Sequence, residues 1–346
     1  MIIRGGRLID PSSGIDTLLD LRIDAGLVTA IGERLDSGDD AVFDATNAYV
    51  APGFIDMHVH LRAPGQPEKE TIATGTAAAI AGGFTAVACM PNTVPALDSA
   101  ATLEELRALI QSEARSRVYS IGAITRQRAG TEPVDYAALA AAGAVGFSDD
   151  GYTVMDPAVL LEAAIASRAV AGRFISHCED ERLKANAAMT LGETSKRLGV
   201  PAAGSIVEDV IVARDLLIAQ QSGHPWHIAH ISTRNAVEFM RWATSRGIDA
   251  TCEAAPHHLM FTDEDVDRLG PAGKVNPPLR SEADVRALRE AVLDGTIDAF
   301  ATDHAPHTQD QKSGDLKGAC VGFSGLEIAI GAYALALPTL GISRYV

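Results

Sequence analysis

The chain has few basic residues, few cysteines and few aromatic side chains, and these shortages exclude several classes of protein. Lysine and arginine number 29 against 45 aspartates and glutamates, and the formal net charge is −16. Without a basic tract, binding to nucleic acid or to an anionic membrane is not expected. The four cysteines lie far apart and form no CxxC pair, which favours reduced cytosolic thiols.

Long apolar runs are also lacking. No apolar stretch reaches the ~18 residues of a membrane-spanning helix. The first residues, MIIRGGRLIDPSSG, do not have the pattern of a secretory signal. We therefore expect a soluble, cytoplasmic protein.

What the chain does contain is an alternation of short β-rich runs with helical patterns. Residues 1–50 predict a small antiparallel β-domain, and residues 51–346 a larger domain. Eight runs of the larger domain are interpreted as strands: GFIDMHVHLR, FTAVACMPN, RVYSIGAIT, AVGFSDD, RFISHCED, WHIAHIS, IDATCEAAPHH and DAFATDHAPH. Eight strand–helix alternations predict an α/β fold, a (β/α)8 TIM-like barrel. An open doubly wound sheet is disfavoured because no G-x-G-x-x-G follows the first strand.

One of the helical patterns carries a possible start signal. The run SIVEDVIVARDLLIAQQ begins with Ser205 and has Glu208 three residues later. This spacing predicts a capping box, in which each side chain binds the backbone N–H of the other residue.

The first strand of the larger domain, GFIDMHVHLR, is unusually polar for a buried segment. Because side chains alternate between the two faces of a strand, Asp56, His58, His60 and Arg62 share one face. The opposite face is apolar. Nitrogen and oxygen donors that converge in this way are what a metal site requires.

Other residues that can bind a metal lie at the ends of later strands. The fourth strand ends in Asp149 and Asp150, the fifth in His177, the sixth in His230 and the eighth in Asp303. A barrel brings these ends to one rim. A set of histidines and carboxylates without cysteine suits Zn²⁺ or a similar divalent ion, and six ligands favour two metals.

The remaining histidines divide into two kinds. His307 returns to the rim directly after Asp303. We interpret the others as structural, although one of the APHH pair could support a ligand: His224, His227, His257, His258 and His304. Asp149 is likewise interpreted as structural.

Taken in order, these motifs resemble those of the amidohydrolase superfamily, and within it the bacterial type I dihydroorotases. The resemblance runs from residue 1 to about residue 335 and rests on GFIDMHVHLR, CMPNT, FSDDG, SHCED, AHIS, APHHL, KVNPPLR and ATDHAPH. It implies the reversible interconversion of N-carbamoyl-L-aspartate and L-dihydroorotate in pyrimidine synthesis.

The resemblance also implies a role for each matching residue. His58, His60 and Asp303 correspond to ligands of a first zinc ion, His177 and His230 to ligands of a second, and Asp150 to the bridge. Asp303 also corresponds to the catalytic general base. The substrate contacts correspond to His60, Arg62, Asn92, Asn276, His307, Val321 and Gly322. The last two, in KGACVGFSG, match less cleanly than the others.

These roles are chemically reasonable. A bound divalent metal lowers the pKa of water to about 7, and a nearby carboxylate such as Asp303 can move the proton. Arg62 offers a planar fork for the carboxylate of an acidic substrate.

Two alternatives stay open. Hydantoinases and allantoinases share the HVH and DH motifs but typically carry a carbamylated lysine at the end of the fourth strand. Here FSDDG has no lysine, and Lys184 lies beyond the fifth strand. The second alternative is a non-catalytic partner of aspartate transcarbamoylase, which would be expected to have lost metal ligands.

The resemblance carries two further expectations. Relatives continue for several dozen residues and complete the small β-domain, so this domain is expected to be incomplete here. A homo-oligomer is expected, and an association with aspartate transcarbamoylase is possible.

Overall fold

The computed structural model describes residues 1–341. The chain divides into two compact units. One is formed by Met1–Phe54 with a segment that starts at Pro338, and the other by Ile55–Leu337. The larger unit contains all the candidate ligands and substrate contacts.

The small unit is a mixed β-sheet with the strand order β3-β2-β1-β4 and with β5 beside β1. β1 (Ile2–Asp10), β2 (Ile15–Asp24) and β3 (Leu27–Gly32) pair antiparallel. β4 (Val42–Asp44) and β5 (Tyr49–Val50) run parallel to β1. The prediction of an antiparallel unit was therefore wrong for the last two strands, because the chain after β3 crosses to the free edge of β1 and enters there in the direction of β1.

A buried carboxylate holds this crossing connection. Asp20 is 3% exposed and accepts hydrogen bonds from the backbone nitrogens of Gly5 and Leu35, both at 3.1 Å. It also pairs with Arg4 at 3.2 Å. Burial alone would raise the pKa of Asp20, but these bonds outweigh it and lower the pKa.

The larger unit is built on an eight-stranded sheet with the order β15-β14-β13-β10-β9-β8-β7-β6. The sheet closes through a parallel bridge between Val59 and His304, supported by a 2.8 Å bond from the His60 nitrogen to the His304 carbonyl. The prediction of a (β/α)8 barrel is therefore confirmed. Its strands are β6 (Phe54–Val59), β7 (Phe84–Cys89), β8 (Arg117–Gly122), β9 (Ala144–Ser148), β10 (Phe174–Ser176), β13 (Trp226–Ile228), β14 (Ala250–Ala254) and β15 (Ala299–Phe300).

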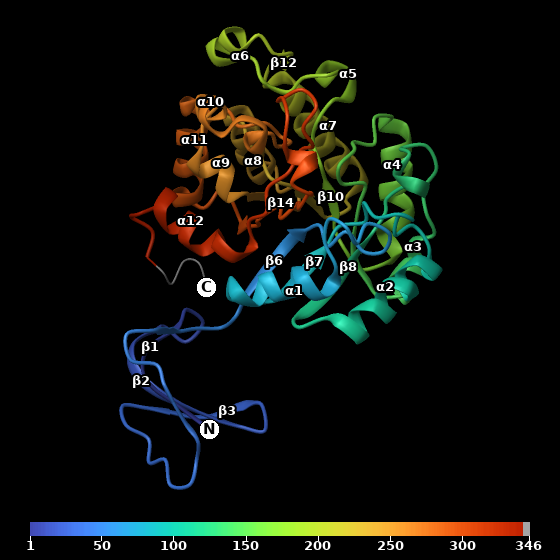
Figure 1. The fold of residues 1–346 in the computed structure, drawn as a ribbon. Helices are drawn as coiled ribbons and strands as arrows, with labels where there is room; N and C mark the ends of the chain where they lie inside the picture. Colours follow the sequence, from blue (N-terminus) through green and yellow to red (C-terminus); the bar gives the residue numbers. More distant parts are fainter. Residues whose placement is uncertain (342–346) are drawn as a thin grey trace. The chain divides into compact units, whose positions relative to one another are not determined.

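Helices surround these strands (Figure 1). Most begin after a serine, threonine or aspartate whose side chain accepts a backbone N–H of the first turn, such as Ser99, Asp156 and Thr233. The main helices that connect successive barrel strands or follow the last one are α1 (Ile72–Ala81), α2 (Ala100–Glu113), α3 (Tyr136–Ala141), α4 (Pro157–Ala166), α7 (Ile206–Ser222), α8 (Arg234–Ser245), α11 (Glu282–Asp294) and α12 (Ala329–Ala336). None of the helices in residues 1–341 is long and apolar enough to span a membrane.

Shorter elements lie in the loops that follow β10 and β14. Figure 1 shows α5, α6 and β12 grouped together beyond the barrel strands. These elements are α5 (Glu181–Lys184), β11 (Met189–Thr190), α6 (Glu193–Leu198), β12 (Ala202–Ala203), α9 (Pro256–Met260) and α10 (Asp265–Leu269).

The start of α7 differs from its prediction. Ser205 has helical backbone angles, with φ −57° and ψ −23°, and its side chain makes no capping bond. Glu208 is buried and instead binds the backbone nitrogen of Ser232 at 2.7 Å and Arg280 at 3.2 Å. The predicted capping box was wrong because a tertiary ion pair uses the carboxylate that the local motif would need.

Candidate metal centre and substrate pocket

The six predicted ligands all lie at one rim of the barrel, at or just beyond the ends of five strands. His58 belongs to β6, and His60 follows it. Asp150, His177, His230 and Asp303 come one to three residues after β9, β10, β13 and β15. All six side chains are buried, with exposed fractions between 0% and 6%. The strands themselves end earlier than predicted, because these polar residues already belong to the loops.

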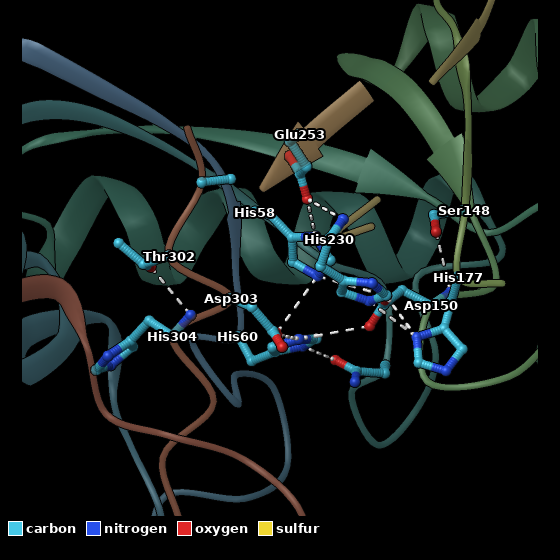
Figure 2. A network of polar contacts seen from close by, with 12 residues as sticks. His58, His60, Ser148, Asp150, His177, His230, Glu253, Thr302, Asp303 and His304 are labelled. Atoms are coloured by element: carbon cyan, nitrogen blue, oxygen red, sulfur yellow. Dashed lines mark hydrogen bonds and ion pairs between the residues drawn. The ribbon is translucent and has the colours of Figure 1, made fainter. Parts of the chain in front are cut away.

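Asp150 lies at the centre of the set (Figure 2). Its Oδ1 atom is 3.4 Å from His58 Nε2, 3.6 Å from His177 Nδ1 and 3.7 Å from His230 Nε2. Its Oδ2 atom is 3.4 Å from His60 Nε2. Two groups of possible metal ligands result, His58–His60–Asp150 and Asp150–His177–His230, and Asp150 is common to both.

Asp303 adjoins the first of these groups. Its Oδ1 atom lies 3.0 Å from His60 Nε2 and 3.5 Å from His58 Nε2. Asp303 and His230 both have positive backbone angles, with φ 48° and 31°, and so does Arg62, with φ 57°. Non-glycine residues rarely adopt this conformation, and such residues gather at functional sites.

The donor atoms fit a bound cation. His58 Nε2 and Asp150 Oδ1 face one another in a buried place, and neither has a hydrogen-bond partner among the described residues. Buried polar atoms are rarely left unsatisfied, and two electron-pair donors at this separation are satisfied by a metal between them. Imidazole and carboxylate ligands suit zinc and similar divalent ions.

Electrostatics point the same way. Burial alone would raise the pKa of Asp150, but the nearby imidazoles of His58, His177 and His230 hold it well below its usual range. Burial would lower the pKa of His177, yet Asp150 and Glu179 raise it to about 9. The positive charge of the protonated histidines thus balances the negative charge of the carboxylates, and a metal cation would take the place of those protons.

Three further side chains hold the histidines in place. Asn92 Oδ1 lies 2.7 Å from His60 Nδ1, Glu253 Oε1 lies 2.7 Å from His58 Nδ1, and Glu179 Oε2 lies 2.9 Å from His177 Nε2. In each case the contact uses the imidazole nitrogen that points away from Asp150, which fixes the ring and its tautomer.

Sequence reasoning missed both glutamates. Glu179 could have been found, because it lies two residues after His177 in SHCED and shares its face. Glu253 offered a weaker signal, a single charged residue in the predicted strand IDATCEAAPHH. Asn92 was predicted as a substrate contact only, and its bond to His60 was not foreseen.

A cavity of about 160 Å³ opens beside the metal ligands. It is lined by the seven predicted substrate contacts: His60, Arg62, Asn92, Asn276, His307, Val321 and Gly322. The structure therefore brings together residues from five separate segments of the chain, including the loop that matched its motif least well.

Arg62 provides the positive charge in this cavity. Its side chain is buried, its Nε donates to the carbonyl of Pro306 at 3.2 Å, and its Nη2 lies 3.3 Å from His307 Nε2. His307 Nε2 is also 2.8 Å from the Val321 carbonyl. Burial and the charge of Arg62 lower the pKa of His307 to about 4, so this histidine is neutral near pH 7.

Lys184 is not between the metal ligands. Its Nζ binds Glu179 Oε2 at 2.7 Å. With the Asn276 amide turned so that its oxygen faces Lys184, the same Nζ donates to it at 2.7 Å. Lys184 thus joins the residue behind His177 to a residue of the substrate cavity.

The residues interpreted as structural lie outside the ligand set. Asp149 accepts bonds from the backbone nitrogens of Ile124 and Thr125 at 2.9 and 3.0 Å. The five other histidines contact groups outside the ligand set. His224 contacts the side chain of Ser167, and His227 contacts the side chains of Glu253 and Thr251. His257 packs against the ring of Phe323, His258 contacts the carbonyl of Pro277, and His304 contacts the carboxylate of Glu70.

Comparisons with known proteins agree with this arrangement. A model of the dihydro-orotase-like family matches residues 48–236. A dihydroorotase of Anaeromyxobacter dehalogenans is 46% identical over 332 residues, which cover 95% of this chain and 77% of the relative. A dihydroorotase of Pelotomaculum thermopropionicum is 44% identical over 342 residues, or 99% of this chain and 80% of the relative.

Solved structures support the fold. The L-hydantoinase of Arthrobacter aurescens superposes with a TM-score of 0.85 at 24% identity, covering 99% of this chain and 79% of that one. A D-hydantoinase from Thermus sp. gives a TM-score of 0.81 at 22% identity, with the same coverage.

The fold and the site together define a (β/α)8 barrel with adjoining histidine–carboxylate groups at its rim that could hold metal ions. Within that class, the chain belongs to the dihydro-orotase-like family of enzymes.

Proposed function

We propose that the chain is a dihydroorotase, which reversibly closes N-carbamoyl-L-aspartate to L-dihydroorotate in pyrimidine synthesis. The observation that carries this proposal is the position of buried Arg62 in the same cavity as the metal ligands. A guanidinium there favours a ring that bears a carboxylate, because it can bind both carboxylate oxygens.

The proposed metal content is two Zn²⁺ ions. His58, His60 and Asp303 would hold the first, His177 and His230 the second, and Asp150 would contact both. When bound, such ions activate water and polarise the amide carbonyl. Asp150 supports this assignment because it is the carboxylate common to both ligand groups.

The chain's own residues would position the ring and move a proton. Arg62 and Asn92 would hold the substrate carboxylate, and Asn276, His307, Val321 and Gly322 would contact the rest of the ring. Asp303 would accept a proton from the attacking water and deliver it to the ring nitrogen as the C–N bond breaks. Although burial alone would raise the pKa of Asp303, the bond from His60 and neighbouring imidazole charge lower it, so the carboxylate is ionised and able to accept.

The test combines metal analysis with turnover of dihydroorotate and of carbamoyl-aspartate. We expect bound zinc, turnover in both directions, and little turnover of dihydrouracil, which lacks the carboxylate. Equal turnover of dihydrouracil would favour a hydantoinase-like cyclic amidase instead. Purified protein that neither binds metal nor turns over either ring would favour the non-catalytic partner of aspartate transcarbamoylase.

Compartment and assembly are further proposals. We place the enzyme in the cytoplasm, since its four cysteines are free. A homo-oligomer and an association with aspartate transcarbamoylase stay predictions from the resemblance. Light scattering on the protein alone and mixed with the transcarbamoylase would test both.

A further inference from the structure

Glu253 lies behind the metal ligands on β14, a strand that contributes none of the six ligands. Its side chain is 1% exposed. Oε1 lies 2.7 Å from His58 Nδ1 and accepts a 3.3 Å bond from the backbone nitrogen of His230. Figure 2 shows this carboxylate above both histidines, which belong to different ligand groups.

The bond to His58 determines which nitrogen is free. A carboxylate can only accept, so the proton of a neutral His58 ring must be on Nδ1. Nε2 then presents its lone pair toward Asp150, on the side where a metal would bind. Without Glu253, either nitrogen could carry the proton, and the ring could turn.

The bonds to residues 230 and 231 act on the backbone. His230 has φ 31°, a conformation unfavourable for a residue with a side chain. Glu253 holds this turn twice, through its carboxylate to the His230 nitrogen and through its own carbonyl to the Ile231 nitrogen at 3.0 Å. The direction in which the His230 imidazole points therefore depends on Glu253.

A third contact orients the carboxylate. His227 Nε2 lies 3.1 Å from Glu253 Oε2, and its Nδ1 lies 2.8 Å from Thr251 Oγ1. His227 is buried and comes from β13, the strand that leads to His230. With one oxygen held by His227, the other is fixed toward His58 and His230.

We propose that Glu253 is a positioning residue that prearranges one ligand from each metal group, His58 through its side chain and His230 through its backbone. This inference rests on the proposed two-metal site. It assigns a task to β14, and it makes metal affinity depend on a residue that touches neither metal nor substrate.

The test is the metal affinity of Glu253→Gln, measured by titration of zinc against a competing chelator. The amide keeps the size of the side chain but loses the charge and one acceptor. We expect the affinity to fall roughly 10- to 100-fold, the usual effect of removing a partner of a metal-bound histidine. The visible absorption of the Co²⁺-loaded protein should also change, because the geometry around the metal is altered.

Asp20→Asn is the matched control. Asp20 is a similarly buried carboxylate that also accepts backbone N–H bonds, but its partners are Gly5, Leu35 and Arg4. Both variants should unfold at lower temperature, whereas only Glu253→Gln should bind zinc more weakly. Zinc affinity and a cobalt spectrum equal to those of wild type in folded Glu253→Gln would overturn the inference.

If Glu253→Gln does not fold, His227→Phe is measured instead. It keeps a ring at this position and removes the bond that orients Oε2, together with the bond to Thr251. We expect a smaller loss of zinc affinity in the same direction, and unchanged affinity would refute the role of Glu253. Wild-type protein that binds zinc but does not turn over dihydroorotate would refute the proposed function alone, and wild-type protein that binds no metal would refute both.

Discussion

Asn92 is expected to have two separable tasks, because its oxygen contacts a metal ligand while the same side chain lines the substrate cavity. Asn92 Oδ1 lies 2.7 Å from Nδ1 of His60, whose side chain is almost fully buried, and the same residue lines the substrate cavity. Asn92→Ala removes both contacts. Asn92→Asp keeps an acceptor for His60 but replaces the amide donor by a negative charge. The two substitutions should therefore affect metal binding and substrate binding differently.

The magnitudes follow from the groups left without a partner. In Asn92→Ala the buried His60 N–H loses its acceptor, which costs about 1–3 kcal/mol. Zinc affinity should then fall roughly 5- to 150-fold, at about 1.4 kcal/mol per factor of ten. In Asn92→Asp zinc affinity should be at least that of wild type. Its KM for dihydroorotate should rise roughly 10- to 150-fold, because a charged hydrogen bond of about 1.5–3 kcal/mol is lost.

The assay pairs zinc titration against a chelator with steady-state kinetics at saturating zinc. Asn235→Ala is the control. The amide of Asn235 lies on α8, outside the site, and donates a hydrogen bond to the carboxylate of Asp209 at 2.7 Å. This substitution should leave both quantities unchanged. The reasoning would be refuted if Asn92→Ala bound zinc as tightly as wild type, or if Asn92→Asp lost zinc as Asn92→Ala does.

Three further predictions concern the charged groups of the site. Asp303→Asn should reduce kcat about 10²–10⁴-fold in both directions of the reaction. A variant that is fully loaded with metal and still turns over substrate like wild type would show that another group, such as His307, carries the proton. Arg62→Lys should weaken the binding of dihydroorotate by about 1.5–3 kcal/mol per charged hydrogen bond lost, and KM should rise accordingly. The KM for dihydrouracil should change little, and an equal change for both rings would contradict the carboxylate assignment. Because the pKa of His177 is raised to about 9, zinc must displace the proton of this imidazole at any pH below that value. The apparent zinc affinity should therefore rise with pH up to about 9. Calorimetry in buffers of different ionisation enthalpy should show that protons are released when zinc binds at pH 7.

Local periodicity was sufficient to predict the barrel. Each of the eight runs contains a strand of the observed sheet, because alternation and flanking turn residues are properties of short segments. The boundaries were less accurate. In DAFATDHAPH only Ala299–Phe300 forms a regular strand, and among the following residues His304 forms isolated bridges to Val59 and Phe323 instead.

Predictions that depended on partners far along the chain were less successful. The capping box at Ser205 was wrong because Arg280 and Ser232, more than 20 residues away, bind the Glu208 carboxylate. The parallel pairing of β4 and β5 with β1 likewise depends on where a connection crosses the sheet, which a local pattern does not specify.

The chain's sequence by itself determined the spacing of His58 and His60 on one strand face and the presence of a donor at the ends of four later strands, since both follow from backbone periodicity. The resemblance had already implied that Asp150 is shared by both ligand groups. Only the tertiary structure decided that Asn92, Glu179 and Glu253 hold the imidazoles from behind. The physical reason is that a hydrogen bond needs two atoms within about 3 Å. His58 and Glu253 are 195 residues apart along the chain, and closure of the barrel is what brings them together.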